Sequence, residues 1–342
     1  MIHRQNWLDV RAYLHHIERV RQNDPQTVKR ARGHLRHLLE WADETPFAKS
    51  RNIDPTFPAY LLAVRKSPSL FSTENGEGLG VGQGVGLSPA SITKCLANAR
   101  QFFDFARSEW TLRYKPISAS WIELLQPPRS VRQDSRLPVR QFWQLDDVMK
   151  VSAVATETLR EERGKVAVCI LFLSGMRADA LASLPISCVD LADRTIYQLP
   201  ERGVRTKNRK AAKTYLLQIP DLLTVVNRWN DLLSASRLPP SALWYSTLSR
   251  DGMTLTPTAH AFEGRHNIIA EDVRLICEKT GIPYLSPHKL RHGHTVYALK
   301  RASNVAQLKA ISQNIMHASL VTTDQIYGKL INDDVQEIIS SL

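Results

Sequence analysis

A proline-rich and arginine-rich stretch near the middle of the chain most constrains its fold. Residues 115–140 are KPISASWIELLQPPRSVRQDSRLPVR, which includes four prolines. Proline fixes φ and lacks a backbone N–H, so helices and strands rarely continue through such a stretch. A chain of 342 residues is also long for a single domain. We therefore predict two domains, residues 1–126 and 141–342, joined by a basic linker over residues 127–140.

The first domain has the apolar spacing of α-helices. In residues 24–44 and again in residues 88–110, apolar side chains recur every three or four positions. The inward-facing positions are Val28, Ala31, Leu35, Leu38, Leu39 and Ala42 in the first stretch, and Ile92, Leu96, Ala99, Phe103 and Ala106 in the second. Asp24 before Pro25 suits a helix cap followed by a first turn. With further helices around residues 4–21 and 55–65, we predict an all-α domain.

Six alternating glycines lie between two of these helices, from Gly76 to Gly86. Phosphate-binding loops are also rich in glycine, but they follow a strand and end in a lysine next to serine or threonine. Neither feature is present here. We interpret the segment as a flexible loop.

The second domain combines helical and strand patterns. Residues 144–185 are typical of helices, and helices are predicted again from Pro257 to the end of the chain. Between them, residues 194–220 indicate a β-hairpin in which Tyr215, Leu217 and Ile219 share one strand face. We predict a mixed α+β domain, mainly helical with a small antiparallel sheet. Trp229 and Trp244 are expected in its core.

The charge of the chain indicates a polyanionic partner. Lysine and arginine number 45 and aspartate and glutamate 33, which gives a formal net charge of +12. Contacts between basic side chains and phosphates release counterions and give affinity whatever the base sequence. High charge also favours solubility alone, so composition leaves both interpretations open. On the helix of residues 24–44, Lys29, Arg32 and Arg36 share one face. This face is either simply solvated or, if the domain closes over DNA, the first candidate for phosphate contacts.

The cysteines and the hydropathy pattern indicate a cytoplasmic protein. Cys95, Cys169, Cys188 and Cys277 form no C-x-x-C pair, and each lies in an apolar stretch. They are typical of buried thiols in a reducing compartment. No apolar run is long enough to cross a bilayer, and the first residues lack the apolar core of a signal peptide. We expect a soluble protein of a bacterium or archaeon, with no membrane partner.

A cluster of basic side chains in residues 286–299, SPHKLRHGHTVYAL, is the clearest functional signal. His288 and His292 are four residues apart and share a helix face, a spacing that suits zinc. The zinc-protease motif needs glutamate beside the first histidine, but Lys289 stands there and Arg291 lies close by. We therefore predict no metal at this site. A basic helix with solvated histidines is the simpler alternative.

Further motifs accompany this cluster in a fixed order. Ser174, Gly175 and Arg177 precede it, and His317, Ser319, Thr322, Thr323 and Tyr327 follow it. Together with His288 and Arg291, this ordered set resembles the tyrosine site-specific recombinases of the phage integrase family. The resemblance covers residues 170–330, and the first domain fits only in its helical character. It implies a helical core-binding domain and a catalytic domain that encircle duplex DNA.

The resemblance also implies a role for each matched residue. Arg177 and Arg291 would hold the DNA phosphate, because a planar guanidinium donates paired hydrogen bonds and stays charged. Tyr327 would attack phosphorus and form a 3′-phosphotyrosyl bond, which needs neither metal nor ATP. The remaining roles are His288 as base for the phenol, His317 as hydrogen-bond donor to the phosphate, and Lys207 as general acid, with Lys210 and Lys213 as alternatives. No cofactor is implied.

Three positions depart from the family pattern. Ala180 stands where the family usually has an acidic residue, and the adjacent Asp179 is turned about 100° away along a helix. Met316 replaces a frequent glycine before the histidine. One additional residue separates the threonines from Tyr327, which makes Tyr297 the alternative tyrosine, although its helix position favours the core.

The resemblance extends to partners and assembly. It implies double-stranded DNA as substrate and four protomers acting on two duplexes, with accessory DNA-binding proteins as further partners. Val335, Ile338 and Ile339 give the C-terminal tail a short apolar helix face, to be buried on a neighbouring protomer or on its own domain. A mobile element is the expected setting. The alternatives are a topoisomerase of type IB that nicks and reseals DNA, and a recombinase-derived DNA-binding protein without activity.

Overall fold

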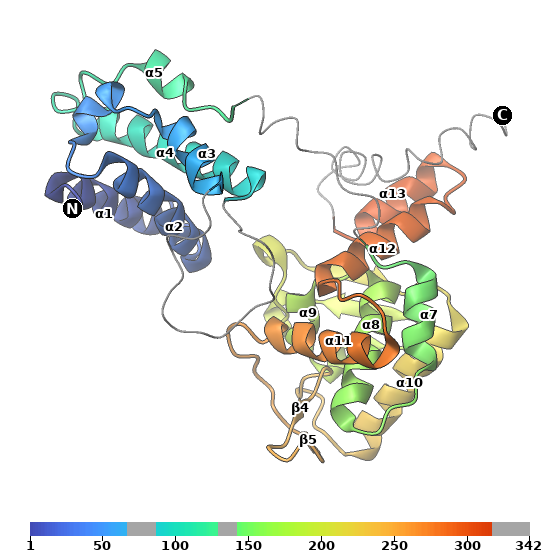
Figure 1. The fold of residues 1–342 in the computed structure, drawn as a ribbon. Helices are drawn as coiled ribbons and strands as arrows, with labels where there is room; N and C mark the ends of the chain where they lie inside the picture. Colours follow the sequence, from blue (N-terminus) through green and yellow to red (C-terminus); the bar gives the residue numbers. More distant parts are fainter. Residues whose placement is uncertain (67–86, 129–141, 317–342) are drawn as a thin grey trace, which may run out of the picture. The chain divides into compact units, whose positions relative to one another are not determined.

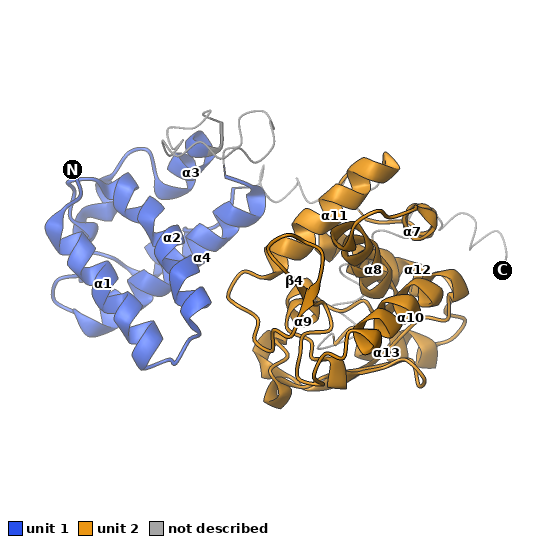
Figure 2. Ribbon diagram, turned by 90° about the horizontal axis from the view of Figure 1, so that it is seen from below, with its two compact units in different colours: residues 1–137 blue, residues 138–342 orange. Residues whose placement is uncertain are grey.

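The structure is a computed structural model that describes residues 1–66, 87–128 and 142–316 (Figure 1). The predicted glycine loop, most of the linker, His317, Tyr327 and the C-terminal tail lie outside the described residues. The chain divides into two compact units, residues 1–137 and 138–342 (Figure 2). The predicted domain limits of 126 and 141 stay a prediction, and each unit is described by itself.

Unit 1 is helical, as predicted. Its elements are α1 (Arg4–Arg19), α2 (Pro25–Ala42), a 3-10 helix (Phe47–Asn52), α3 (Phe57–Lys66), α4 (Pro89–Glu109) and α5 (Ala119–Glu123). All the apolar positions predicted to face inward on α2 and α4 are buried. They pack in one core with aromatic side chains such as Phe47, Phe102 and Tyr114.

The two longest helices of unit 1 begin in the same way. The side chain of Asp24 accepts a hydrogen bond from the Thr27 backbone N–H at 3.0 Å, and Ser88 caps Ser91 at 3.1 Å. A proline follows each cap residue. Proline lacks an N–H, but the N–H at this first helical position has no partner within the helix in any case. The predicted cap at Asp24 is therefore confirmed.

Unit 2 is built around one buried helix. Its elements are α7 (Leu145–Ala153), α8 (Leu159–Ser174), α9 (Ala178–Ala182), β1 (Val189–Asp190), β2 (Thr195–Gln198), β3 (Ala212–Tyr215), α10 (Pro220–Ala235), β4 (Thr247–Leu248), β5 (Leu255–Thr256), α11 (His266–Thr280), α12 (Pro287–Leu299) and α13 (Val305–Asn314), with short 3-10 turns at Ile186–Cys188, Pro200–Arg202 and Lys207–Arg209. In Figure 1, α8 lies among α7, α10, α11 and α12, which all contact it. Residues 166–173 of α8 are apolar on every side and fully buried, as such a stretch has to be.

The strands form two small antiparallel sheets, in the orders β1-β2-β3 and β4-β5. In the first sheet, Thr195 pairs with Tyr215 and Gln198 with Ala212. The predicted fold class, a helical domain and a mainly helical α+β domain with a small antiparallel sheet, is confirmed. The four cysteines are free and buried, as predicted. None of the helices within the described residues has the length and hydropathy to cross a bilayer.

Two details of the predicted second domain are wrong. The strand β3 ends at Tyr215, whose side chain is exposed, so Tyr215, Leu217 and Ile219 do not form one strand face. The Leu217 N–H donates to the Leu173 carbonyl, and Pro220 then starts α10. Helix also does not resume at Pro257. It begins at His266, after Gly264 turns the chain with a φ of +82°.

A buried carboxylate joins α8 to α11. Asp272 on α11 is fully buried and accepts hydrogen bonds from Arg160 at 2.9 Å, from Arg163 at 2.8 Å and from the Tyr245 hydroxyl at 2.5 Å. Gly164 allows this close approach, because a Cβ there would lie 2.6 Å from the Asp272 carbonyl oxygen. A buried charge is tolerated only when it is paired in this way.

Loss of this carboxylate should destabilise the packing of α8 against α11. We expect Asp272→Ala to lower the local free energy of unfolding by about 3–5 kcal/mol, because two guanidinium groups lose their buried partner. Hydrogen exchange of α8 and α11 peptides in the full chain measures this change. Glu271→Ala is the control, since its exposed carboxylate lies 3.7 Å from Arg160 and should contribute less than about 1 kcal/mol. Equal losses in the two variants would contradict the expectation.

Candidate active site

One buried guanidinium links three of the family motifs. Arg291 on α12 is 2% exposed. One of its terminal nitrogens donates to the Gly175 carbonyl at 2.6 Å, and the other donates to the Ile315 carbonyl. Gly175 belongs to the Ser-Gly-x-Arg segment, and Ile315 lies two residues before His317. Carbonyl oxygens carry no net charge, so these bonds orient the guanidinium without cancelling its positive charge.

The Ser-Gly segment makes a turn that only glycine can make here. Gly175 ends α8 with a φ of +62°, in the left-handed region. A Cβ at this position would lie 2.6 Å from His294 Cδ2 and 2.9 Å from Ile315 Cγ2. The Ser174 hydroxyl holds the turn by accepting from the Met176 N–H at 3.2 Å. The turn brings Arg177 to the first residue before α9.

Arg177, His288 and Arg291 share one electrostatic environment. Arg177 is half-buried, and His288 lies in the first turn of α12 with an exposed side chain. The pKa of His288 is lowered, first because its ring loses part of its hydration and then because Arg291, Arg177 and Lys289 are nearby cations. His288 is therefore neutral at pH 7, which is the state that a base requires. The structure brings these three predicted site residues together.

The paired histidines of α12 lie against each other as expected from their spacing. The ring centroids of His288 and His292 are 4.8 Å apart, and the rings are nearly perpendicular. Within the part of the chain that the structure describes, no group of three histidine, cysteine or carboxylate side chains could hold a metal ion.

His294 has a structural position that the sequence did not reveal. It is buried, and its Nδ1–H donates to the Phe172 carbonyl at 2.7 Å, near the end of α8. Burial lowers its pKa to about 4, so it is neutral. The neighbouring Gly293 also lies against the core, because a Cβ there would lie 2.1 Å from the Trp143 carbonyl oxygen. His294 therefore supports the turn at Gly175 from inside the protein.

The candidate general acids lie on the connection between β2 and β3 and on β3 itself. Lys207, Lys210 and Lys213 are all exposed. Lys213 is on β3, with its ammonium 5.4 Å from the centre of the Tyr197 ring, whereas Lys207 and Lys210 flank a tight turn. The turn is held near α9 because the Arg205 N–H donates to Ser183 Oγ at 2.8 Å. The choice of Lys207 stays a prediction.

The departures from the family pattern have physical explanations. Ala180 is buried, and Asp179 instead pairs with His266 at 3.1 Å, so its carboxylate faces the start of α11. Met316 has a φ of +56°, in the region that favours glycine. Tyr297 is half-buried and packs against Phe172 with ring centroids 5.8 Å apart, in line with the expected core position.

The other predicted residues fall in two groups. Lys29, Arg32 and Arg36 are exposed on α2 of unit 1, and Arg36 also forms an ion pair with Glu40 at 2.6 Å. Their role in DNA binding stays a prediction. Trp229 and Trp244 are fully buried, which confirms that they belong to the core.

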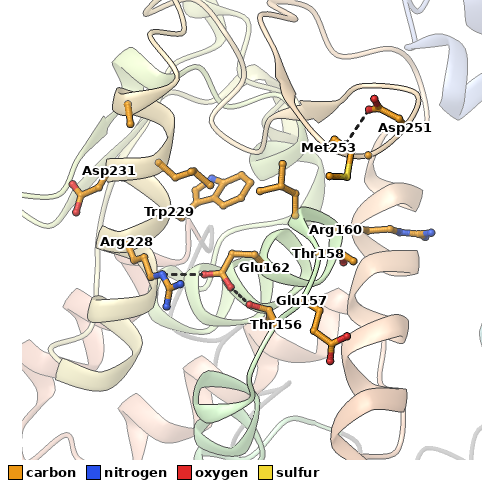
Figure 3. Close-up of a pocket in the computed structure, with 14 residues that line it drawn as sticks. Thr156, Glu157, Thr158, Arg160, Glu162, Arg228, Trp229, Asp231, Asp251 and Met253 are labelled. Atoms are coloured by element: carbon orange, nitrogen blue, oxygen red, sulfur yellow. Dashed lines mark hydrogen bonds and ion pairs between the residues drawn. The ribbon is translucent and has the colours of Figure 1, made fainter.

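A separate hollow of about 800 Å³ lies between the start of α8, α10 and residues 251–253 (Figure 3). Trp229 forms part of its wall. Glu162 accepts a hydrogen bond from Thr156 there and faces Arg228 at 4.0 Å. Of the predicted catalytic residues that the structure describes, none lines this hollow, so it is distinct from the basic cluster of Arg177, His288 and Arg291.

The turn at Gly175 gives a test of the site geometry. We expect Gly175→Ala to lower the free energy of unfolding of unit 2 by about 2–4 kcal/mol, because positive φ is strained and the new methyl group meets His294. Gly203→Ala is the control, since Gly203 also has positive φ but faces open space. It should lose only about 1 kcal/mol. Hydrogen exchange of α8 and α12 peptides distinguishes the two, and a similar loss at both positions would show that close approach at Gly175 does not matter.

His294 gives a pH dependence of known sign. Its pKa is about 4 in the folded chain and about 6.5 in an unfolded one. The unfolded chain therefore binds a proton first as the pH falls. We expect unit 2 to lose about 3 kcal/mol of stability between pH 7 and pH 4 through this residue. His294→Phe should remove that part of the pH slope, measured by hydrogen exchange of α12 at several pH values. An unchanged slope would assign it to other groups.

Comparison with known proteins gives the family. The sequence model of the phage integrase family matches residues 141–332. The tyrosine recombinase XerC of Salmonella typhi is 24% identical over 339 residues, which cover 97% of this chain and 93% of that protein. XerC of Bacillus licheniformis is 26% identical over 261 residues, 75% of each chain.

Solved structures of similar fold include integrases bound to DNA. The Tn1549 transposon integrase, in complex with a circular intermediate DNA, superposes with a TM-score of 0.60 and 15% identity over all of both chains. A lambda integrase dimer bound to a COC' core site gives 0.60 and 12%, over 93% of this chain and 75% of that one. Since the family model spans more than half of the sequence, the chain belongs to the phage integrase family, the tyrosine site-specific recombinases.

Proposed function

We propose that this chain cuts and rejoins DNA strands at a specific site through a phosphotyrosyl intermediate. The observation that carries the proposal is the buried Arg291, which ties the Gly175 turn and the segment before His317 to α12. Arg177 and His288 lie in the same electrostatic environment. A cluster of cations built on rigid elements is what a phosphodiester requires.

The arginines would stabilise the charge that builds on phosphorus during the reaction. The nonbridging oxygens of a phosphodiester are anionic and gain negative charge when a nucleophile adds. Arg177, just before α9, and Arg291, on α12, would donate hydrogen bonds to them from two parts of unit 2. Loss of one preorganised donor of this kind costs about 3–4 kcal/mol of transition-state stabilisation.

The proposed reaction exchanges one phosphodiester for another. The phenolic oxygen of Tyr327 attacks phosphorus, the bond from phosphorus to the 5′ oxygen breaks, and a 3′-phosphotyrosyl bond forms. The phenol proton passes to neutral His288, and Lys207 gives a proton to the leaving oxygen. A 5′-hydroxyl reverses the steps and rejoins a strand. The bond energy is conserved in the intermediate, so no ATP is consumed.

The proposed partners follow from relatives and charge. One structural neighbour is a lambda integrase tetramer bound to a Holliday junction, with a TM-score of 0.59. We propose four protomers of this chain on two duplexes, with Lys29, Arg32 and Arg36 contacting phosphates. The tail beyond Tyr327 would bury its apolar residues on a neighbouring protomer. A mobile element in a bacterial or archaeal cytoplasm is the proposed setting, with accessory DNA-binding proteins as further partners.

A covalent adduct tests the nucleophile directly. A library of random duplexes, each nicked just 3′ of a candidate cleavage site, loses a short fragment on cleavage and traps the adduct. Sequencing the trapped DNA recovers the target. On that duplex, the wild-type chain should form an adduct that survives denaturation, in the presence of a chelator. Tyr327→Phe should abolish it because the phenolic oxygen is the attacking atom.

Tyr297→Phe is the matched control and should retain at least about half of the wild-type adduct. An adduct formed by the Tyr327→Phe variant would show that the nucleophile is another residue. Normal DNA binding without any wild-type adduct would favour the inactive DNA-binding protein. Relaxation of any supercoiled plasmid by a monomer would favour the topoisomerase.

A further inference from the structure

Asn314, the last residue of α13, bonds across to the sheet. The Tyr215 N–H donates to Asn314 Oδ1 at 2.7 Å, and Asn314 Nδ2 donates to the Tyr215 carbonyl at 3.0 Å. Tyr215 is the last residue of β3. An asparagine at a helix end commonly bonds its own backbone. This one instead joins two segments that are far apart in the sequence.

The sheet offers this contact because β3 is an edge strand. The strand order is β1-β2-β3, so among the described residues one side of β3 has no strand beside it. Backbone groups on an open edge need other partners. The amide of Asn314 has the same donor and acceptor as a peptide group, and it takes the place of a neighbouring strand at Tyr215. It therefore fixes the distance between α13 and the hairpin.

A second bond reinforces this joint. The Thr214 hydroxyl is buried and donates to the Asn314 carbonyl at 3.3 Å. It also accepts a hydrogen bond from Gln198 on β2 at 2.6 Å. Both strands of the hairpin are thus connected to the end of α13, one directly and one through Thr214.

The next carbonyl along the chain belongs to the proposed active site. Ile315 O accepts from Arg291, and the preceding carbonyl, Asn314 O, accepts from the hairpin. Two consecutive carbonyls are therefore held by different elements, one by Arg291 and the other by the β2–β3 hairpin that carries the three candidate lysines. The joint links the candidate general acid to the candidate phosphate clamp.

We propose that Asn314 is a positioning residue, whose side-chain amide holds the lysine-bearing hairpin in register with Arg291 so that a lysine can protonate the leaving 5′ oxygen. The proposal rests on the function proposed above. It assigns a specific step to Asn314, because a displaced hairpin would leave phosphate binding and tyrosine attack in place. Only transfer of the lysine proton to the leaving group would suffer.

A sulfur leaving group separates these steps. An alkoxide is a poor leaving group and needs the proton, whereas a thiolate leaves unprotonated because a thiol has a pKa near ~8.5. We use two nicked duplexes of the recovered target sequence that differ only at the bridging 5′ atom, oxygen or sulfur. The rate of adduct formation on each is measured in single turnover.

Asn314→Ala should slow cleavage of the oxygen substrate about 10- to 100-fold, within the usual contribution of general acid catalysis. It should slow cleavage of the sulfur substrate less than about 3-fold. Asn314→Asp keeps the side-chain volume and the acceptor for the Tyr215 N–H but loses the donor to the Tyr215 carbonyl. It should show the same pattern. It serves as the second variant if Asn314→Ala folds poorly. Asn304→Ala is the control, because Asn304 only caps the other end of α13, where it accepts from Gln307 N–H at 2.9 Å.

The lysine variants complete the test. Of Lys207→Ala, Lys210→Ala and Lys213→Ala, the one that shows the same sulfur rescue identifies the general acid. Adding Asn314→Ala to it should cause no further loss on oxygen. Equal slowing on both substrates, or no slowing on either, would overturn the role of Asn314. If the wild-type chain forms no adduct with either substrate, the proposed function itself fails, which is a distinct result.

Discussion

The bonds from Arg291 to the Gly175 and Ile315 carbonyls are the constraint on which the site depends. Burial of a guanidinium is unfavourable unless its donors are satisfied. Unit 2 solves this problem in two ways. Arg163 meets the carboxylate of Asp272, which pairs its charge and joins helices. Arg291 is oriented by neutral carbonyls instead. These hydrogen bonds hold the planar guanidinium in one orientation, which suits paired hydrogen bonds to an anionic phosphate.

Patterns within a single element were predictable from the sequence. The 3.6-residue period located α2 and α4 with their buried faces, and Asp24 before Pro25 marked the start of α2, because these signals depend on neighbours a few residues away. The family was predictable because several short motifs follow one another in a fixed order over residues 170–330. By contrast, Leu217 and Ile219 alternate as they would in a strand but do not continue β3. The Leu217 N–H bonds to the Leu173 carbonyl instead of a neighbouring strand, and α10 begins directly after Ile219. That competition comes from tertiary contacts that no local pattern contains.

The roles of Gly175, His294 and Asn314 could not be predicted from the sequence, because they too depend on tertiary contacts. A glycine after serine at a helix end is explained by a left-handed cap alone, and only the fold shows that His294 and Ile315 also require the missing Cβ. The sequence does not show which of the three histidines in this basic helix is buried, and only the fold identifies His294. Asn314 resembles an ordinary helix-end residue, and its partner Tyr215 lies at the edge of a sheet whose extent was itself predicted wrongly.

Met316 shows how these contacts act together. A residue with a side chain in the left-handed region is strained by about 1–2 kcal/mol, which explains why the family often has glycine there. Strain of this kind persists when the surrounding structure over-determines the backbone. Here the Asn314 carbonyl is held by Thr214, the Ile315 carbonyl by Arg291, and the Met316 N–H donates to the Gln313 carbonyl at 2.8 Å. The peptide groups before Met316 are therefore fixed by other parts of unit 2, so Met316 adopts a positive φ without the conformational freedom of glycine.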